Sequence, residues 1–357
     1  MQKFELTSFV SYRAQNKTKP GVLPRLILDD GSIDPRSHTT RRLSAPKWSM
    51  VVDRNSLHGS TMVGYQGWFN CPNDSMGLGW KHWAKDKTKP VAVSNCVVDF
   101  LPDVSEFDTD ELCMAADMKN ANGESVQLFS SANRKTVLRH FQWMHSYGLD
   151  GIFLQRFGNG LHDQRYLQNY NTVLDNVISG AEQYGRTFVI MYDISGMKSG
   201  TVYSTIYGDW NNIEERVLTQ SSRYQFHNKK PLVAIWGIGF KDRPYSLEEC
   251  HRLVEALTNR GCSIMLGLPT GWREFKRDSV TAPFLHEIVQ LADIVSPWSK
   301  YNCMCGASQL NIGTPKSCGQ VSVSHGSENP RKTILGPRSR MVPGPPKRLH
   351  AGCLSWL

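Results

Sequence analysis

No run of 18 apolar residues occurs in the sequence, so it predicts no membrane-spanning helix. A G-x-G-x-x-G turn is also absent, because the pair Gly237 and Gly239 lacks the third glycine of a dinucleotide-binding loop. The nine cysteines have no regular spacing, and Cys303 and Cys305 stand too close together for the usual zinc knuckle. We therefore expect ordinary thiols rather than a disulfide framework, and neither a metal nor a cofactor.

Acidic residues are scarce at both ends of the chain. Residues 299–357 hold one Asp or Glu against eight Lys and Arg, residues 1–60 hold five against ten, and residues 61–298 carry a net charge of −3. Neither end shows a sustained helical or strand period, and the C-terminal end is dense in Pro and Gly. We expect an irregular basic extension over 1–60, one folded domain over 61–298 and a disordered basic tail over 299–357. Residues 1–15 lack the layout of a secretory signal, so the expected location is cytoplasmic.

The domain over 61–298 alternates between two kinds of segment. Short apolar runs rich in β-branched residues predict six buried strands, at 61–67, 149–157, 186–196, 231–240, 262–272 and 292–298. Amphipathic stretches between them predict helices, three of which end in a glycine just before the next strand: Gly148, Gly185 and Gly261. A strand, helix, strand order with this spacing predicts parallel βαβ units.

Six parallel strands fit either an open doubly wound sheet or an incomplete eight-stranded barrel. A doubly wound sheet gathers its functional residues at one switch point, whereas a barrel places them at the carboxyl ends of many strands. Polar and aromatic residues follow every predicted strand here, which favours an α/β fold of the (β/α)8 TIM-barrel type with about six βα units. The strand-end residues are Tyr65, Gln66, Trp68, Gln155, Arg156, Tyr192, Asp193, Trp236, Trp272 and Trp298.

A ring of aromatic and amide side chains is typical of a carbohydrate site. Flat aromatic faces pack on the C–H face of a pyranose, and amides or carboxylates bind its hydroxyls. The loop after the first strand adds Trp80, His82 and Trp83 to the predicted substrate-binding residues. A single tryptophan is more often a core residue, and a single histidine such as His82 is more often solvated or hydrogen-bonded within the protein than a ligand-binding residue. The prediction therefore rests on the agreement of many strand ends. Asp193, the candidate catalytic carboxylate, either contacts the sugar or caps the following loop.

Several of these segments together resemble a known family. The stretches are GYQGWFN, GWKHWAK, DFLPDVSEF, YGLDGIFLQRF, VIMYDISG, VAIWGIGF, MLGLPTGWRE and ADIVSPW. In order and spacing over residues 61–298 they are similar to the barrel proteins of glycoside hydrolase families 71 and 99, which include α-glucanases, endo-α-mannosidases and uncharacterised xylosidase/arabinosidase-like branches. The resemblance implies a (β/α)8 barrel that holds a sugar at the carboxyl ends of its strands.

The family's catalytic pair has no counterpart in this chain. The resemblance implies two glutamates three residues apart near the end of the last barrel strand, yet no E-x-x-E occurs in the sequence, and Glu328 is the one acidic residue after Trp298. Because glycoside hydrolysis needs two carboxyl groups, we expect a truncated family member with impaired catalysis. A barrel that lacks two strands has two open edges, so we also expect low stability.

Two other classes of function remain open at this point. A carbohydrate-binding remnant would keep the aromatic ring without turnover. An interaction protein would use its basic ends, because VPGPPKR matches a loose proline-rich recognition pattern. We expect a carbohydrate partner, no nucleic acid and no membrane partner, and the sequence leaves the oligomeric state open.

Overall fold

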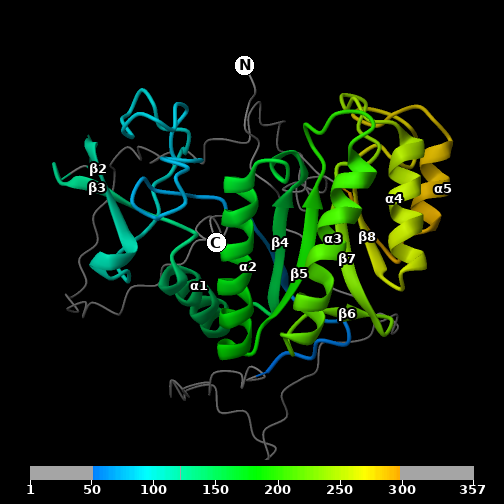
Figure 1. The fold of residues 1–357 in the computed structure, drawn as a ribbon, viewed down its shortest axis with the longest axis horizontal. Helices are drawn as coiled ribbons and strands as arrows, with labels where there is room; N and C mark the ends of the chain where they lie inside the picture. The colour runs from blue at the N-terminus through cyan, green and yellow to red at the C-terminus, as the bar shows by residue number, and fades with distance from the viewer. Residues whose placement is uncertain (1–50, 121, 298–357) are drawn as a thin grey trace, which may run out of the picture.

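The computed structural model of the chain describes residues 51–120 and 122–297 (Figure 1). The predicted extension therefore lies largely outside the described residues. The predicted tail, Trp298 and the pair Cys303 and Cys305 lie wholly outside them. In the part of the chain that is described, no helix has the length and apolar character needed to cross a membrane.

A parallel sheet with its strands in chain order forms the centre of the fold. Its strands are β1 (Met62–Tyr65), β4 (Gly151–Phe157), β5 (Thr187–Asp193), β7 (Lys230–Trp236), β8 (Ser263–Leu268) and β9 (Ile294–Pro297), paired in the order β1-β4-β5-β7-β8-β9. A short strand, β6 (Phe226–His227), pairs antiparallel with β7. All six predicted strands are confirmed.

Helices connect successive strands and pack on one face of the sheet (Figure 1). They are α1 (Arg134–Tyr147), α2 (Gln164–Tyr184), α3 (Val202–Thr219), α4 (Leu247–Asn259) and α5 (Phe284–Gln290), with single 3-10 turns η1 (Thr109–Glu111) and η2 (Gly158–Gly160). Gly148 and Gly185 end α1 and α2 in the left-handed conformation as predicted, whereas α4 ends at Asn259 with Arg260 as its C-cap, two residues before Gly261. A doubly wound sheet would have helices on both faces and a reversal of strand order. Residues 51–120 and 122–297 therefore form a partial (β/α) barrel with six parallel strands.

Strand alternation gives the sheet two different faces. Residues such as Ile152, Ile190 and Ile235 point outward and pack with the helices in the largest hydrophobic core. Their neighbours point to the inner side, where a smaller core forms from Leu57, Met62, Phe153, Val189, Leu232, Ala234, Met265 and Ile294. We call these the outer and inner faces. Which face a strand-end residue belongs to decides its role below.

A second unit lies between β1 and α1. The hairpin of β2 (Leu112–Lys119) and β3 (Ser125–Phe129) packs with the loops after β1 around a separate core that contains Phe69, Trp83 and Phe129. A disulfide joins Cys71 in the loop to Cys113 in β2. The prediction of ordinary thiols is thus wrong for these two cysteines. Their separation of 42 residues carries no signal in the sequence, because the tertiary packing of loop on hairpin brings them together.

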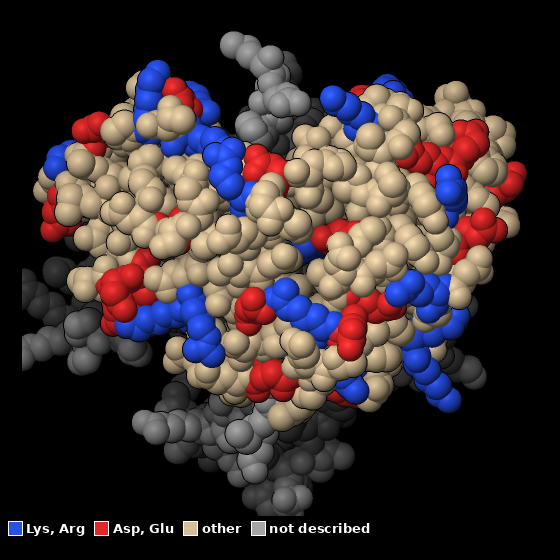
Figure 2. Space-filling view, viewed as in Figure 1, with Lys and Arg blue, Asp and Glu red and all other residues tan. Residues whose placement is uncertain are grey.

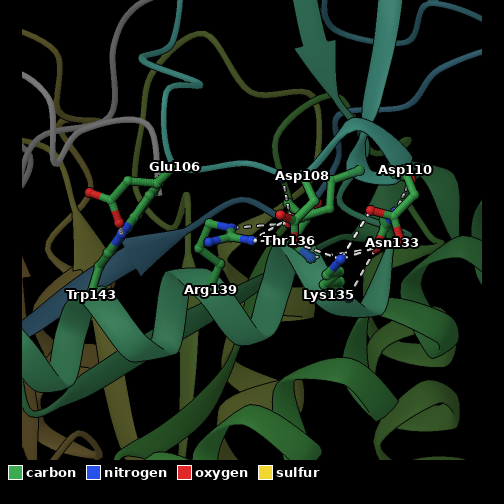
Figure 3. A network of polar contacts seen from close by, with 9 residues as sticks. Glu106, Asp108, Asp110, Asn133, Lys135, Thr136, Arg139 and Trp143 are labelled. Carbon is green, nitrogen blue, oxygen red and sulfur yellow. Dashed lines mark hydrogen bonds and ion pairs between the residues drawn. The ribbon is translucent and has the colours of Figure 1, made fainter.

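Charged side chains attach this second unit to α1 (Figure 3). The fully buried carboxylate of Glu111 accepts from Arg139, with an Nη2 to Oε2 distance of 2.5 Å, and Lys135 bridges Asp108 and Asp110 at 2.6 and 3.0 Å. The indole of Trp143 donates to Glu106 at 2.8 Å. The network fixes the segment that leads into the hairpin against the outer helix layer.

Candidate functional site

The predicted strand-end residues separate into two sets because side chains alternate along each strand. Gln155 and Asp193 lie on the inner face, two residues beyond the inner-core positions Phe153 and Met191. Trp236 pairs in register with Asp193 and belongs to the same face. Arg156 and Tyr192 are the neighbours of these residues in sequence and therefore point outward. Gln155, Asp193 and Trp236 form what we call the inner-edge site.

The Asp193 carboxylate occupies the centre of the inner-edge site. Its Oδ2 accepts from Gln155 Nε2 at 2.6 Å, and its Oδ1 accepts from the backbone N–H of Ser195 at 2.8 Å. The second contact caps the loop after β5, which is one of the two roles that the sequence left open for Asp193. Burial raises the pKa of Asp193 above its ordinary value, although Ser195, Arg243 and Gln155 act in the opposite direction. A carboxyl with a raised pKa can hold a proton at mildly acidic pH, as a general acid must.

Aromatic side chains flank Asp193 on both sides. The ring of Trp236 lies directly over Gly267, where a Cβ would come within 1.9 Å of the indole, so glycine is required under this ring. On the other side Phe157, the register partner of Asp193, contacts Trp68 edge to face at 6.3 Å between centroids. Trp68 in turn stacks on His82 at 4.3 Å with an interplanar angle of 13°. Half-buried Trp236 is thus a direct neighbour of the carboxylate, and half-buried Trp68 is linked to it through Phe157.

His82 is a neutral member of this stack. Burial lowers its pKa to about 3, and the charges of Lys81 and Lys87 add to the shift. Its backbone is in the left-handed region with φ of 61°. The ring therefore carries no charge at neutral pH and serves as a flat surface against Trp68.

The outward-facing residues are sealed under α3. Arg156 Nε and Nη2 bind the two oxygens of Asp209 at 2.8 and 2.6 Å, and the Tyr192 hydroxyl donates to Asp209 Oδ2 at 2.8 Å. All three side chains are buried. Sequence reasoning missed Asp209, and the signal that could have found it is an acidic residue on the apolar side of the helix that follows β5. As placed, Arg156 and Tyr192 anchor a helix and do not face the inner-edge site.

Three further predicted residues are enclosed in the protein. The Tyr65 hydroxyl is hydrogen-bonded to His140 Nδ1 of α1 at 2.9 Å. Trp83 is buried in the second core, where its indole donates to the carbonyl of Phe129 at 2.9 Å. Trp80 belongs to the same core. Within this structure these side chains are not accessible to a ligand.

The other predicted residues are Gln66, Trp272 and Trp298. Gln66 directly follows β1 and is half-buried. Trp272 lies in the loop after β8, where its carbonyl is hydrogen-bonded to His286 at 3.0 Å and its ring contacts that of the same histidine. Trp298 is outside the described residues. The prediction that these residues bind substrate stays a prediction.

Other carboxylates near the sheet bind backbone N–H groups or a lysine. Asp150 and Asp293 accept hydrogen bonds from backbone N–H groups at the amino ends of the strands. Asp278 accepts from the backbone of Thr270 and Gly271, and Glu274 forms an exposed pair with Lys276. Among residues 51–120 and 122–297, Asp193 is the one carboxylate that belongs to a strand of the parallel sheet.

The acidic cluster of Asp108, Asp110 and Glu111 is the one group of potential metal ligands in the described residues. Lys135 and Arg139 already compensate these carboxylates, as Figure 3 shows. Glu111 is bound on both oxygens and Asp108 and Asp110 share one ammonium. The arrangement fits an ionic clasp between two segments rather than a metal centre.

Comparisons with known proteins find matches among solved structures alone. No family model and no curated protein matches the sequence. Among solved structures, a GH99 endo-alpha-mannosidase from Bacteroides thetaiotaomicron matches with 10% identity and a TM-score of 0.36, covering 70% of this chain and 85% of that chain. A structure of a GH99 endo-alpha-mannosidase with bis-tris-propane matches with 9% identity and a TM-score of 0.34, over 70% and 84%. The description of the fold rests on the sheet itself.

Proposed function

We propose that the chain is a glycoside-hydrolase-like protein that binds a carbohydrate at the inner edge of its sheet and hydrolyses it poorly. The observation that carries the proposal is the Gln155–Asp193 pair beside the half-buried Trp236, with Trp68 linked to the same edge through Phe157. An amide and a carboxylate can bind neighbouring sugar hydroxyls while an indole packs on the sugar's C–H face. The family resemblance of the strand-end motifs supports the same class of ligand.

Poor hydrolysis follows from the number of carboxylates. Cleavage of a glycosidic bond uses one carboxyl group to protonate the leaving oxygen and a second one to attack or to activate water. Asp193, with its raised pKa, suits the first role. Asp209 is bound to Arg156 under α3 and cannot supply the second. Binding that is equal for substrate and transition state does not raise turnover.

Binding and turnover are measured separately in the experiment that tests this function. The full chain and the Asp193→Asn variant are applied to a glycan array, and hits are assayed for hydrolysis as α-mannoside, α-glucan, xyloside and arabinoside substrates. We expect saccharide binding that weakens about tenfold in the variant, because one charge-assisted hydrogen bond is lost. Turnover should stay near background in both. Retention of no glycan would overturn the binding proposal, and efficient hydrolysis would show that a second carboxylate had been missed.

A further inference from the structure

The loop that carries Trp80, His82 and Trp83 also brings two lysines to one point. Lys87 Nζ donates to the Tyr166 hydroxyl at 2.9 Å, and Lys81 Nζ donates to the same oxygen at 3.4 Å. The two ammonium groups lie 4.6 and 5.0 Å from the centroid of the Tyr166 ring. Two positive charges therefore converge on one neutral phenol at the start of α2.

The loop holds these lysines in place through its backbone. Trp80 N–H donates to the carbonyl of Lys87 at 2.9 Å, and Gly79, with φ of 64°, approaches the same carbonyl so closely that a Cβ would come within 2.3 Å of it. The carbonyl of Lys81 accepts from Asn70 N–H at 3.2 Å. Both lysines are half-buried. The backbone hydrogen bonds of the loop thus hold the two lysines in this arrangement.

No carboxylate in the described ranges forms an ion pair with either lysine. The acids nearest in sequence to Lys87 and to Tyr166 have their own cations: Asp86 pairs with Lys89 at 3.1 Å, and Asp163 pairs with Arg165 at 3.2 Å. A phenol oxygen offers two lone pairs and no charge to groups that carry six N–H donors between them. Two like charges that converge on one oxygen repel each other. An anion at this point would remove that repulsion.

The titration of Tyr166 agrees with a positive local field. Burial raises its pKa, yet the two lysines outweigh burial, and the net shift is downward. Lys81 directly precedes His82, whose ring stacks on Trp68. Figure 2 shows Lys and Arg side chains over the end of α2 that lies at the carboxyl ends of the strands in Figure 1. The amino end of α2 adds a favourable partial charge for an anion.

We propose that Lys81, Lys87 and Tyr166 form a subsite for an anionic substituent, a phosphate, sulfate or carboxylate, of the bound saccharide. The proposal rests on the carbohydrate function above and narrows its ligand to acidic sugars. Two ammonium groups as point charges accept any of these three anions, and the phenol hydroxyl adds a donor. The stack of Trp68 and His82 would lie between this subsite and Asp193.

The test is titration of the full chain with five probes: glucose, glucose 6-phosphate, glucose 6-sulfate, glucuronate and inorganic phosphate. Calorimetry is run on the unmodified protein and on Lys81→Gln and Lys87→Gln. Lys85→Gln is the matched control, because Lys85 belongs to the same loop but donates to the carbonyl of Ser94. Thermal melts confirm that each variant is folded. We expect at least one acidic sugar to bind about tenfold more tightly than glucose, and each subsite variant to lose about tenfold for that sugar while glucose and the control are unaffected.

Each other outcome decides between the subsite and the carbohydrate function. Equal affinity for glucose and the acidic sugars, or no effect of the two variants, overturns the subsite and leaves the carbohydrate function standing. Lysine-dependent binding of inorganic phosphate without binding of any sugar supports an anion site and overturns the carbohydrate function. Binding of no probe overturns both.

Discussion

On the outer face of the sheet, Arg156 and Tyr192 both bind the buried carboxylate of Asp209 in α3. On the inner face, their sequence neighbours Gln155 and Asp193 bind each other at the carboxyl ends of the strands. The difference is one residue along the strand. It follows from alternation of side chains, and it assigns helix anchoring to one pair and ligand contact to the other. Four changes break or sharpen this comparison.

The largest effect is expected from Asp209→Asn on the outer face. This variant leaves the Arg156 guanidinium, which is 1% exposed, without a counter-charge, so the free energy of unfolding should fall by about 3–5 kcal/mol. Urea denaturation measures it. The matched control is Asp175→Asn, which makes the same change in the exposed pair with Arg216 and should cost less than about 1 kcal/mol. Equal losses in the two variants would contradict the role of the sealed ion pair.

Tyr192→Phe is expected to have the next largest effect. It removes one hydroxyl that donates to the buried Asp209 carboxylate, a contact to a charged group that is worth about 1.5–3 kcal/mol. The unfolding free energy should fall by that amount while saccharide affinity stays constant, because the hydroxyl points away from the inner edge. A loss of affinity with intact stability would reverse the assignment of faces.

His140 and Asp193 should make stability depend on pH with opposite signs. Burial lowers the pKa of His140, which lies under the outer layer, to about 3 from 6.5, so the unfolded chain binds a proton that the folded one excludes. The contribution of the neutral histidine to the free energy of unfolding is complete above pH 6.5. On acidification below that pH, it should fall by about 1.4 kcal/mol per pH unit for each such group. His82 adds a second contribution of the same sign. In His140→Gln, urea midpoints between pH 7 and 5 should vary less steeply, and an unchanged slope would contradict this.

Asp193→Asn should change stability least. Because the pKa of Asp193 is raised, the folded state keeps this proton at a pH at which the unfolded chain has lost it. The free energy of unfolding should therefore decrease as the pH rises from 3.8 through the pKa of the folded state. Removing the charge should alter the unfolding free energy at pH 7 by less than about 1 kcal/mol, because a flip of the Gln155 amide keeps their hydrogen bond. A loss above about 2 kcal/mol at pH 7 in urea would place Asp193 among the anchoring residues.

Much of this fold could be predicted because buried parallel strands leave apolar runs in the sequence. Gly148 and Gly185 likewise mark helix ends through a left-handed conformation that favours glycine. The roles of strand-end residues could not be assigned in the same way, since Arg156 and Gln155 look equally polar in the sequence and the phase of alternation decides between them. Asp209, Lys81 and the Cys71–Cys113 bridge depend on contacts between distant segments, which no local pattern records.

The central claim is that saccharide affinity belongs to the inner face and stability to the outer face. The most direct measurement is calorimetric titration of one array hit into Trp236→Ala and Tyr192→Phe, with urea denaturation of both. The account predicts an affinity loss of about tenfold in Trp236→Ala, because the indole surface beside Asp193 is removed, and unchanged affinity with reduced stability in Tyr192→Phe. Unchanged affinity in folded Trp236→Ala together with a loss in Tyr192→Phe would contradict it.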